Sequence, residues 1–162
     1  DVILVGEIRN RETAETAILA GESGHLVIGT LHANSGVGTI QKMLSWFGDN
    51  ERAGKMQSIA NSLIGVVCHM LLPSKDEDGY VLGTEVLSNF DQELSKMLSE
   101  PAQLAAFMDR PTAERRGSLR FVDSLCDLVR NERISDSQAM RAVAGLPGAQ
   151  QQLSQLIKQG GN

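Results

Sequence analysis

Glu7 directly follows a continuous apolar run, residues 1–6, whose sequence is DVILVG. The run lacks the alternation of a half-exposed strand and is typical of a strand buried on both faces of a parallel sheet. Ligands of such sheets bind beyond the carboxyl ends of the strands, where Glu7 would lie. A carboxylate there, the general form of the Walker B element, can bind Mg²⁺ directly or through water and polarise an attacking water. In the alternative, purely structural reading, Glu7 caps the following helix or pairs with Arg9 or Arg11.

A second apolar run, residues 26–31, ends directly before His32. A neutral imidazole at the end of this strand could sense a phosphate group or pass a signal to a neighbouring subunit, although a satisfied surface or core histidine is the alternative. Thr30 alternates onto the same face as His32 and could orient Glu7 or hydrogen-bond a water, although threonine also suits a strand on propensity alone. His25 lies about 23 Å from His32 along an extended strand. We therefore expect His25 at the opposite sheet edge, in a structural or interface role.

The elements that must position Glu7 and His32 form a predicted β-α-β unit. Helix formers followed by a glycine predict a helix over residues 13–20 between the two apolar runs, so the two strands must be parallel. Two further helices, joined near Gly48, are indicated by apolar residues spaced three and four apart. These residues are Ile40, Met43, Leu44 and Phe47 in the first helix, and Ile59, Leu63, Val66 and Val67 in the second.

The rest of the chain predicts an edge hairpin and then helices. Residues 68–72 and 80–87 flank a polar loop and suit an antiparallel hairpin at the sheet edge. From residue 91 onward the pattern is helical, with breaks at Pro101, 111–117, 132–135 and 145–148. The predicted fold class is therefore α/β, with residues 1–89 as part of a parallel-sheet core and residues 90–162 as a helical subdomain.

Composition narrows the classes of protein that fit. A length of 162 residues with 41% apolar residues fits one soluble globular domain, or a piece of one, and neither a disordered nor a fibrous protein. Fifteen basic against 20 acidic residues, a net charge of -5, provide no overall positive field for nucleic acid or anionic lipid. Cys68 and Cys126 lie far apart in apolar surroundings, which indicates buried thiols in a reducing cytoplasm.

Two further features of the sequence concern membranes and the ends of the chain. The apolar run from Leu63 to Leu72 is much shorter than the roughly 20 residues that span a bilayer. The chain opens without an initiator Met and without a signal-peptide pattern, so the sequence predicts a fragment of a longer protein.

Three stretches occur in order over about 35 residues: DVILVGEIR, then ETA, then SGHLVIGTLHANS. Together they closely resemble the Walker B and histidine-box motifs of the secretion-superfamily traffic ATPases. These motors power type II secretion, type IV pilus retraction, and type IV secretion or conjugation. The resemblance continues more weakly through TEVL of the predicted hairpin and through residues 117–135, so it covers most of the chain.

The resemblance implies a RecA-like P-loop NTPase core in a hexameric ring, with ATP and Mg²⁺ at sites that neighbouring subunits complete. Glu7 looks like the Walker B glutamate, catalytic and close to Mg²⁺. His32 looks like the catalytic histidine of the histidine box, with Thr30 in support. Arg9 and Glu12 look like the ion-pairing residues that support the nucleotide site.

The resemblance also implies interfaces and partners. Gly24 and His25 look like histidine-box residues with a structural or interface role. The implied partners are further copies of the chain and an inner-membrane platform or secretion apparatus, with a cytoplasmic location peripheral to the inner membrane. Direct nucleic-acid binding is not expected.

Departures from the family pattern qualify this hypothesis. No G-x-x-x-x-G-K-[ST] sequence supplies a phosphate cradle, so we expect this chain alone not to hydrolyse ATP. Asn10 replaces the usual Asp, which removes a carboxylate near Arg9. The two cysteines cannot supply the four-cysteine zinc module usual in pilus-assembly and type II secretion ATPases, and residues 91–100 lack the A-I-R-N-L-I-R-E helix of retraction ATPases. These departures favour the type IVB secretion and plasmid-conjugation branch. The alternative function is a non-enzymatic assembly or partner-docking module.

Overall fold

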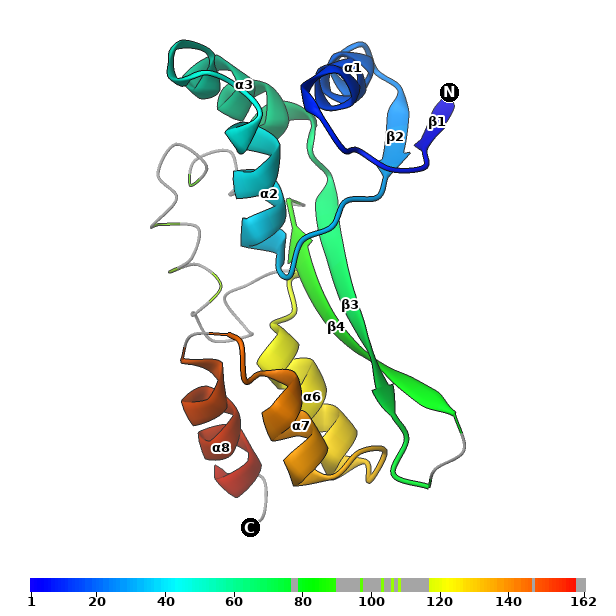
Figure 1. Cartoon of the computed structure of the whole chain (residues 1–162), viewed down its shortest axis with the longest axis vertical. Helices are drawn as coiled ribbons and strands as arrows, with labels where there is room; N and C mark the ends of the chain where they lie inside the picture. Colours follow the sequence, from blue (N-terminus) through cyan, green and yellow to red (C-terminus); the bar gives the residue numbers. More distant parts are fainter. Residues whose placement is uncertain are drawn as a thin grey trace. The chain divides into compact units, whose positions relative to one another are not determined.

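The computed structural model describes residues 1–76, 79–89, 117–146 and 148–159, together with Met97, Gln103, Ala106 and Met108. The sequence-based break at Pro101 and most of the segment 91–100 lie outside these residues. The elements, shown in Figure 1, are β1 (Val2–Val5), α1 (Arg11–Glu22), β2 (Leu26–Gly29), α2 (Gly36–Ser45), α3 (Asp49–Ser62), β3 (Gly65–Pro73), β4 (Tyr80–Ser88), α6 (Phe121–Arg130), α7 (Asp136–Ala142) and α8 (Ala149–Gln159).

β1 and β2 form a parallel pair that α1 connects (Figure 1). The register runs from Val2 opposite Leu26 to Val5 opposite Gly29. The predicted β-α-β unit is confirmed. This arrangement brings the carboxyl ends of both strands to the same edge, which is what places Glu7 within reach of the segment after β2.

β2 is shorter than the predicted strand, because it ends at Gly29 and not at Leu31. Its partner β1 ends at Val5, so no strand residues remain to pair with the residues after Gly29. One further backbone hydrogen bond, 2.8 Å from the Ile8 amide to the Thr30 carbonyl, joins the two segments beyond the ladder. The residues that follow β2 therefore form a loop tied to the loop after β1.

Three helices complete this part of the chain. α1 is longer than predicted, and its N-cap is Asn10, whose side-chain oxygen accepts a hydrogen bond from the Thr13 amide at 3.0 Å. α1 buries Ala14, Ala17 and Ile18 and packs against α3. The predicted junction between the next two helices near Gly48 is confirmed, because Gly48 is the N-cap residue of α3.

The predicted continuation of the second of these helices to Val67 is wrong. α3 ends at Ser62, and β3 begins at Gly65. The buried Asn89 amide explains the end of the helix, since its Nδ2 donates to the carbonyls of Ala60 and Leu63 at 3.0 and 2.8 Å. These bonds satisfy carbonyl groups that would otherwise accept from a further helical turn. The β-branched pair Val66–Val67 then suits the strand better than the helix.

β3 and β4 pair as the predicted hairpin, but among the described residues they form a two-stranded sheet of their own and not the edge of the sheet that contains β1 and β2. Its turn is closed by a hydrogen bond of 3.1 Å from the Ser74 amide to the carbonyl of Gly79, which adopts a φ of 89°. One face of the hairpin buries Leu72 and Val81 against α6. The opposite face exposes Leu71 and other apolar side chains.

α6, α7 and α8 pack around a second hydrophobic core. Leu125, Val143 and Leu153 are fully buried there. The helices are separated where the sequence predicted breaks, at Glu132, which has a φ of 56°, and at Gly148, which has a φ of 73°. Ser135 and Gln138 form a reciprocal capping box at the start of α7.

The chain divides into two compact units. The first unit comprises residues 1–66 and 87–118, and the second comprises residues 67–86 and 119–162. This division differs from the predicted one at residue 89, because the strands of the hairpin contribute residues to both units. None of the described helices combines the length and apolar character needed to cross a membrane.

Candidate functional site

The Glu7 carboxylate lies just beyond β1 and contacts two basic side chains. Its Oε2 accepts from Arg9 Nη2 at 2.5 Å, and its Oε1 lies 3.3 Å from His32 Nε2. The Glu7 side chain is 24% exposed, whereas those of Arg9 and His32 are 74% and 87% exposed. The structure thus brings Glu7 and His32 together at one edge of the strand pair, with both basic partners open to solvent. It also contains the ion pair with Arg9 that the structural alternative for Glu7 predicted.

The charges around Glu7 favour its ionised form. The hydrogen bond from Arg9 lowers the pKa of the Glu7 carboxyl, and the nearby charges of His32 and Lys42 act in the same direction against the opposing effect of desolvation. Glu7 is therefore a carboxylate at neutral pH, as a Mg²⁺ ligand or a general base has to be. Sequence reasoning missed Lys42, whose ammonium donates to the His32 carbonyl at 2.9 Å.

Thr30 holds the loop that carries Glu7. Its hydroxyl donates to the Gly6 carbonyl, and its own carbonyl accepts from the Ile8 amide. The two bonds therefore fix the backbone on both sides of Glu7. Gly29 permits this arrangement, because a Cβ at that position would lie 2.8 Å from Ile8 Cδ1.

Glu12 and Asn10, which the resemblance places near Arg9, do not contact the Glu7 carboxylate in the structure. Arg9 pairs with Glu7, whereas Glu12 makes no ion pair with any residue that the structure describes. Asn10, where the family pattern has Asp, is the N-cap of α1, and its Oδ1 accepts from both the amide and the hydroxyl of Thr13 at 3.0 Å. An amide oxygen caps a helix as well as a carboxylate does. The departure at Asn10 therefore leaves the start of α1 intact.

Gly24 and His25 lie at the other end of β2. Gly24 has a φ of 92°, a conformation that favours glycine, in the turn between α1 and β2. His25 is exposed, and its Nδ1 lies 3.2 Å from Ser23 Oγ. Because His25 precedes β2 and His32 follows it, the structure keeps these two histidines at opposite ends of the strand.

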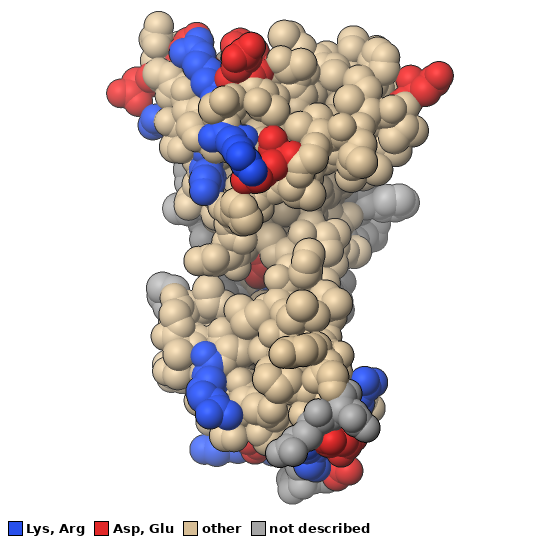
Figure 2. Space-filling view, turned by 45° about the vertical axis from the view of Figure 1, so that its right-hand side comes forward, with Lys and Arg blue, Asp and Glu red and all other residues tan. Residues whose placement is uncertain are grey.

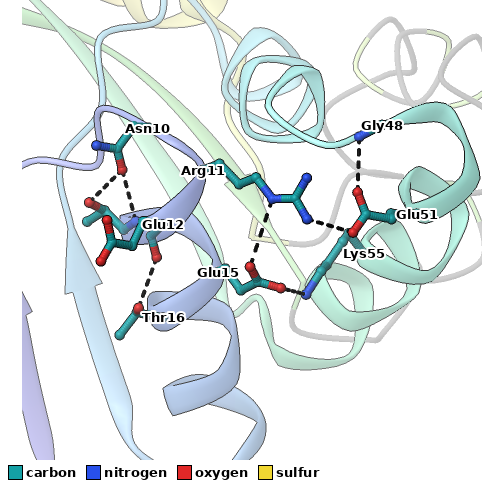
Figure 3. A network of polar contacts seen from close by, with 9 residues as sticks. Asn10, Arg11, Glu12, Glu15, Thr16, Gly48, Glu51 and Lys55 are labelled. Atoms are coloured by element: carbon teal, nitrogen blue, oxygen red, sulfur yellow. Dashed lines mark hydrogen bonds and ion pairs between the residues drawn. The ribbon is translucent and has the colours of Figure 1, made fainter.

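A network of four charged side chains, also missed by sequence reasoning, lies between α1 and α3 (Figure 3). Arg11 donates to Glu51 at 2.6 Å, and Lys55 donates to Glu15 at 2.6 Å. The pairs at positions 11 and 15 and at positions 51 and 55 have the spacing of helix-surface ion pairs, and that was the available signal. Sequence spacing could not show that the two pairs face each other.

The described residues contain no group of three or more His, Cys, Asp or Glu side chains arranged to hold a metal ion. Among the residues that the structure describes, Glu7 is the acidic side chain that contacts His32. This arrangement fits Mg²⁺ as it is bound with nucleotides, where one or two carboxylates suffice because phosphates and water fill the remaining positions. It does not fit a metal ion held by protein side chains alone.

Comparison with known sequences decides the family. Residues 1–101, more than half of the chain, match the family described as type II/IV secretion system protein. The chain belongs to this family.

Its relatives include a twitching motility protein and a pilus retraction ATPase. A twitching motility protein of Neisseria gonorrhoeae is 32% identical over 141 residues, which cover 87% of the chain and 37% of that protein. The type IV pilus retractation ATPase PilT of Pseudomonas aeruginosa is 39% identical over 87 residues, covering 54% of the chain and 25% of that protein. The chain thus spans well under half the length of these relatives.

Solved structures of secretion and pilus ATPases have the same fold. The ATPase DotB of Legionella pneumophila aligns with a TM-score of 0.76 at 27% identity, over 89% of the chain and 38% of that protein. The pilus retraction motor PilT with bound ADP aligns with a TM-score of 0.75 at 31% identity, over 88% of the chain and 39% of that protein. The fold is therefore the RecA-like α/β fold of secretion ATPases.

Proposed function

We propose that the full-length protein containing this chain is a hexameric ATPase motor. It would power protein or DNA secretion, conjugative transfer or type IV pilus dynamics at the cytoplasmic face of the inner membrane. Family membership supports the ATPase class, and the contact between Glu7 and His32 at the carboxyl edge of a parallel strand pair supports the site. The departures noted in the sequence favour the type IVB secretion and conjugation branch.

In this proposal Glu7 and His32 are the catalytic residues. Glu7 would be the Walker B carboxylate, which would bind Mg²⁺ directly or through water and polarise the attacking water, and His32 would lie on the phosphate side. Thr30 orients Glu7 through the backbone, because its hydroxyl and carbonyl bind on either side of that residue. When bound, Mg²⁺ would neutralise charge on the nucleotide phosphates.

The remaining residues are assigned to the surroundings of the nucleotide and to interfaces. Arg9 supports the nucleotide site through Glu7, and its exposed side chain can also meet a neighbouring subunit. Glu12 lies two positions into α1, where its carboxylate is exposed. Gly24 and His25 belong to a structural or interface region at the other end of β2.

The net charge of -5, together with the charges on one face of the molecule, supports partners other than nucleic acid. On the face drawn in Figure 2, Lys and Arg side chains lie beside Asp and Glu side chains, and the described residues there form no broad basic area. We infer partners among further copies of the protein and the membrane platform of a secretion apparatus, with peripheral location at the inner membrane.

Substitution of Glu7 in the full-length protein tests the proposed function. Glu7→Gln keeps the size of the side chain but removes its charge, so ATP turnover should fall by at least about 100-fold, as for loss of a general base, while ATP binding stays. The matched control is Glu22→Gln, an exposed carboxylate at the last position of α1, which should keep turnover. Retained turnover in Glu7→Gln would remove Glu7 from the mechanism.

The second candidate function is a non-enzymatic docking module, and the absence of a P-loop sequence from these 162 residues favours it for the chain alone. Calorimetry of the isolated chain with ATP tests the docking module. We expect no binding at micromolar concentrations, because no Walker lysine or phosphate-binding loop is present in the chain. Micromolar binding would contradict both the docking module and the incomplete site.

A further inference from the structure

Five side chains form what we call the charge clamp: Phe47 and the four charged residues Arg11, Glu15, Glu51 and Lys55, of which Figure 3 shows the charged ones. Arg11 binds Glu51 at 2.6 Å and approaches Glu15 to 4.0 Å, and Lys55 binds Glu15 at 2.6 Å. Both cations also lie over the Phe47 ring, at 5.6 and 5.3 Å from its centroid. The clamp thus alternates positive and negative groups around one aromatic side chain that is 2% exposed.

The clamp has the features that distinguish a stabilising network from an isolated surface pair. A single exposed ion pair contributes little, because solvent screens it and two long side chains lose their freedom. Here the Lys55 side chain is 18% exposed, and Glu15 and Glu51 are about one third exposed. The Arg11 hydrogen bond lowers the pKa of the Glu51 carboxyl. Each cation is thus held by a carboxylate and by the face of the buried ring.

The clamp joins the segments that follow both candidate catalytic residues. Arg11 is the first residue of α1, four positions after Glu7. Phe47 follows α2, the helix that begins directly after the His32 loop. Glu51 belongs to the first turn of α3. Movement of α1 relative to the end of α2 would therefore change the clamp as well as the position of Glu7 relative to His32.

We propose that the charge clamp is a positioning device that fixes the Glu7–His32 contact. Thr30 already holds the backbone around Glu7 from the side of β2. The clamp holds the same segment from the other side, where the chain enters α1. Glu51 and Lys55 are thus positioning residues that touch neither Glu7 nor His32. This role rests on the proposed function of Glu7.

The test compares two carboxylates in the first turn of α3 in the full-length protein. Glu51→Gln removes the charge that binds Arg11 but keeps an oxygen that can accept from the Gly48 amide. Asp49→Asn is the control, because Asp49 pairs with Arg52 at 3.1 Å and lies outside the clamp. We expect Glu51→Gln to lower kcat for ATP hydrolysis about tenfold with KM for ATP within about twofold, as for an effect on the transition state. Asp49→Asn should leave both constants unchanged.

A double-mutant cycle shows whether the change in kcat arises from loss of the Arg11–Glu51 ion pair. Arg11→Gln should lower kcat as much as Glu51→Gln, and the double variant should be no slower than either single variant. Lys55→Gln, which breaks the contact with Glu15, should also lower kcat. It provides the measurement if Glu51→Gln does not fold.

The outcomes separate this inference from the proposed function. Should Glu51→Gln lower the melting temperature but keep the kcat of wild type, or match Asp49→Asn in every respect, the clamp has no positioning role. Additive losses in the double variant would also contradict it. If one of these results is found and Glu7→Gln abolishes turnover in the same assay, only the positioning role of the clamp is contradicted, and the proposed function stands. If Glu7→Gln keeps turnover, the proposed function fails, and the role of the clamp fails with it.

Discussion

The helices of the second unit and the paired strands of the first unit differ in how far their apolar side chains are buried. In the second unit, Leu125 and Leu153 have no exposed surface, and the helices bury one another's apolar faces. In the first unit, apolar residues of the paired strands lie in solvent, with Leu4 75% and Ile28 50% exposed. The helices of the second unit therefore cover one another's apolar faces. The outer face of its hairpin, where Leu71 is 61% exposed, and the strands of the first unit do not receive partners from the described residues.

The difference shows what holds the candidate site in place. Val5 and Val27 pack against the core, but Leu4 and Ile28 leave the other face of β1 and β2 exposed, so the position of Glu7 depends strongly on specific polar contacts. These are the Thr30 bonds on one side and the charge clamp on the other. The second unit instead depends on close packing, as at Gly83, where an added Cβ would lie 3.1 Å from the Phe121 ring. Substitutions of apolar and of polar residues should thus have unequal effects in the two units.

Truncation of a leucine in each unit should give the largest contrast. Leu125→Ala should destabilise the second unit by about 3 kcal/mol, because it leaves a cavity in a filled core. Leu4→Ala should cost less than about 0.5 kcal/mol, as surface substitutions do. Hydrogen exchange of the full-length protein measures both, with amides of α6 and α8 expected to exchange about 100-fold faster in Leu125→Ala. If Leu4→Ala costs as much stability as Leu125→Ala, residues outside this chain cover β1 in the full-length protein. The difference in burial between the two units would then hold only for these 162 residues.

Replacement of the cap of α1 should have an intermediate effect. Asn10→Ala removes the acceptor for the Thr13 amide and should cost about 1 kcal/mol, whereas Asn10→Asp should change stability by only a few tenths. The measurement is exchange of the amides in the first turn of α1, with the first turn of α7 as an unchanged reference. A similar loss in both variants would mean that the Thr13 hydrogen bond is not what stabilises the start of the helix.

The smallest effect should be a difference in titration between the units. The bond to Arg9 lowers the pKa of Glu7, whereas burial raises the pKa of the Cys126 thiol. The Glu7 ion pair should therefore stabilise the first unit above the ordinary pKa of glutamate and be lost as the pH falls through the lowered value. Carboxyl NMR of the full-length protein should show the Glu7 midpoint rising in Arg9→Gln, and a midpoint that does not move would exclude Arg9 as the cause.

The sequence predicted the parts of the fold that depend on local patterns. Apolar runs that end in Glu7 and His32 predicted two parallel strands with a shared edge, and the polar loop before Tyr80 predicted the hairpin. The end of α3 was not predictable in this way. Leu63 and Val66 fit helical spacing, and the decisive contact comes from Asn89, 29 and 26 positions away from the two carbonyls that it binds.

The candidate site was predictable to the same extent. Glu7, Thr30 and His32 occupy neighbouring strand ends, so topology alone brought them together. The clamp was not predicted, because its two shortest bonds each join residues 40 positions apart. Asn10 was understood only as a lost carboxylate, since the sequence does not show that its oxygen faces the Thr13 amide.

The way in which the chain alternates between its units limits how the protein can be divided. The chain passes from one unit to the other between residues 66 and 67, between 86 and 87, and between 118 and 119. No uninterrupted stretch of the gene therefore encodes either unit by itself. A single protease cut at any of these three places would leave both units covalently joined. Recombination at one point could therefore neither remove nor transplant the second unit by itself.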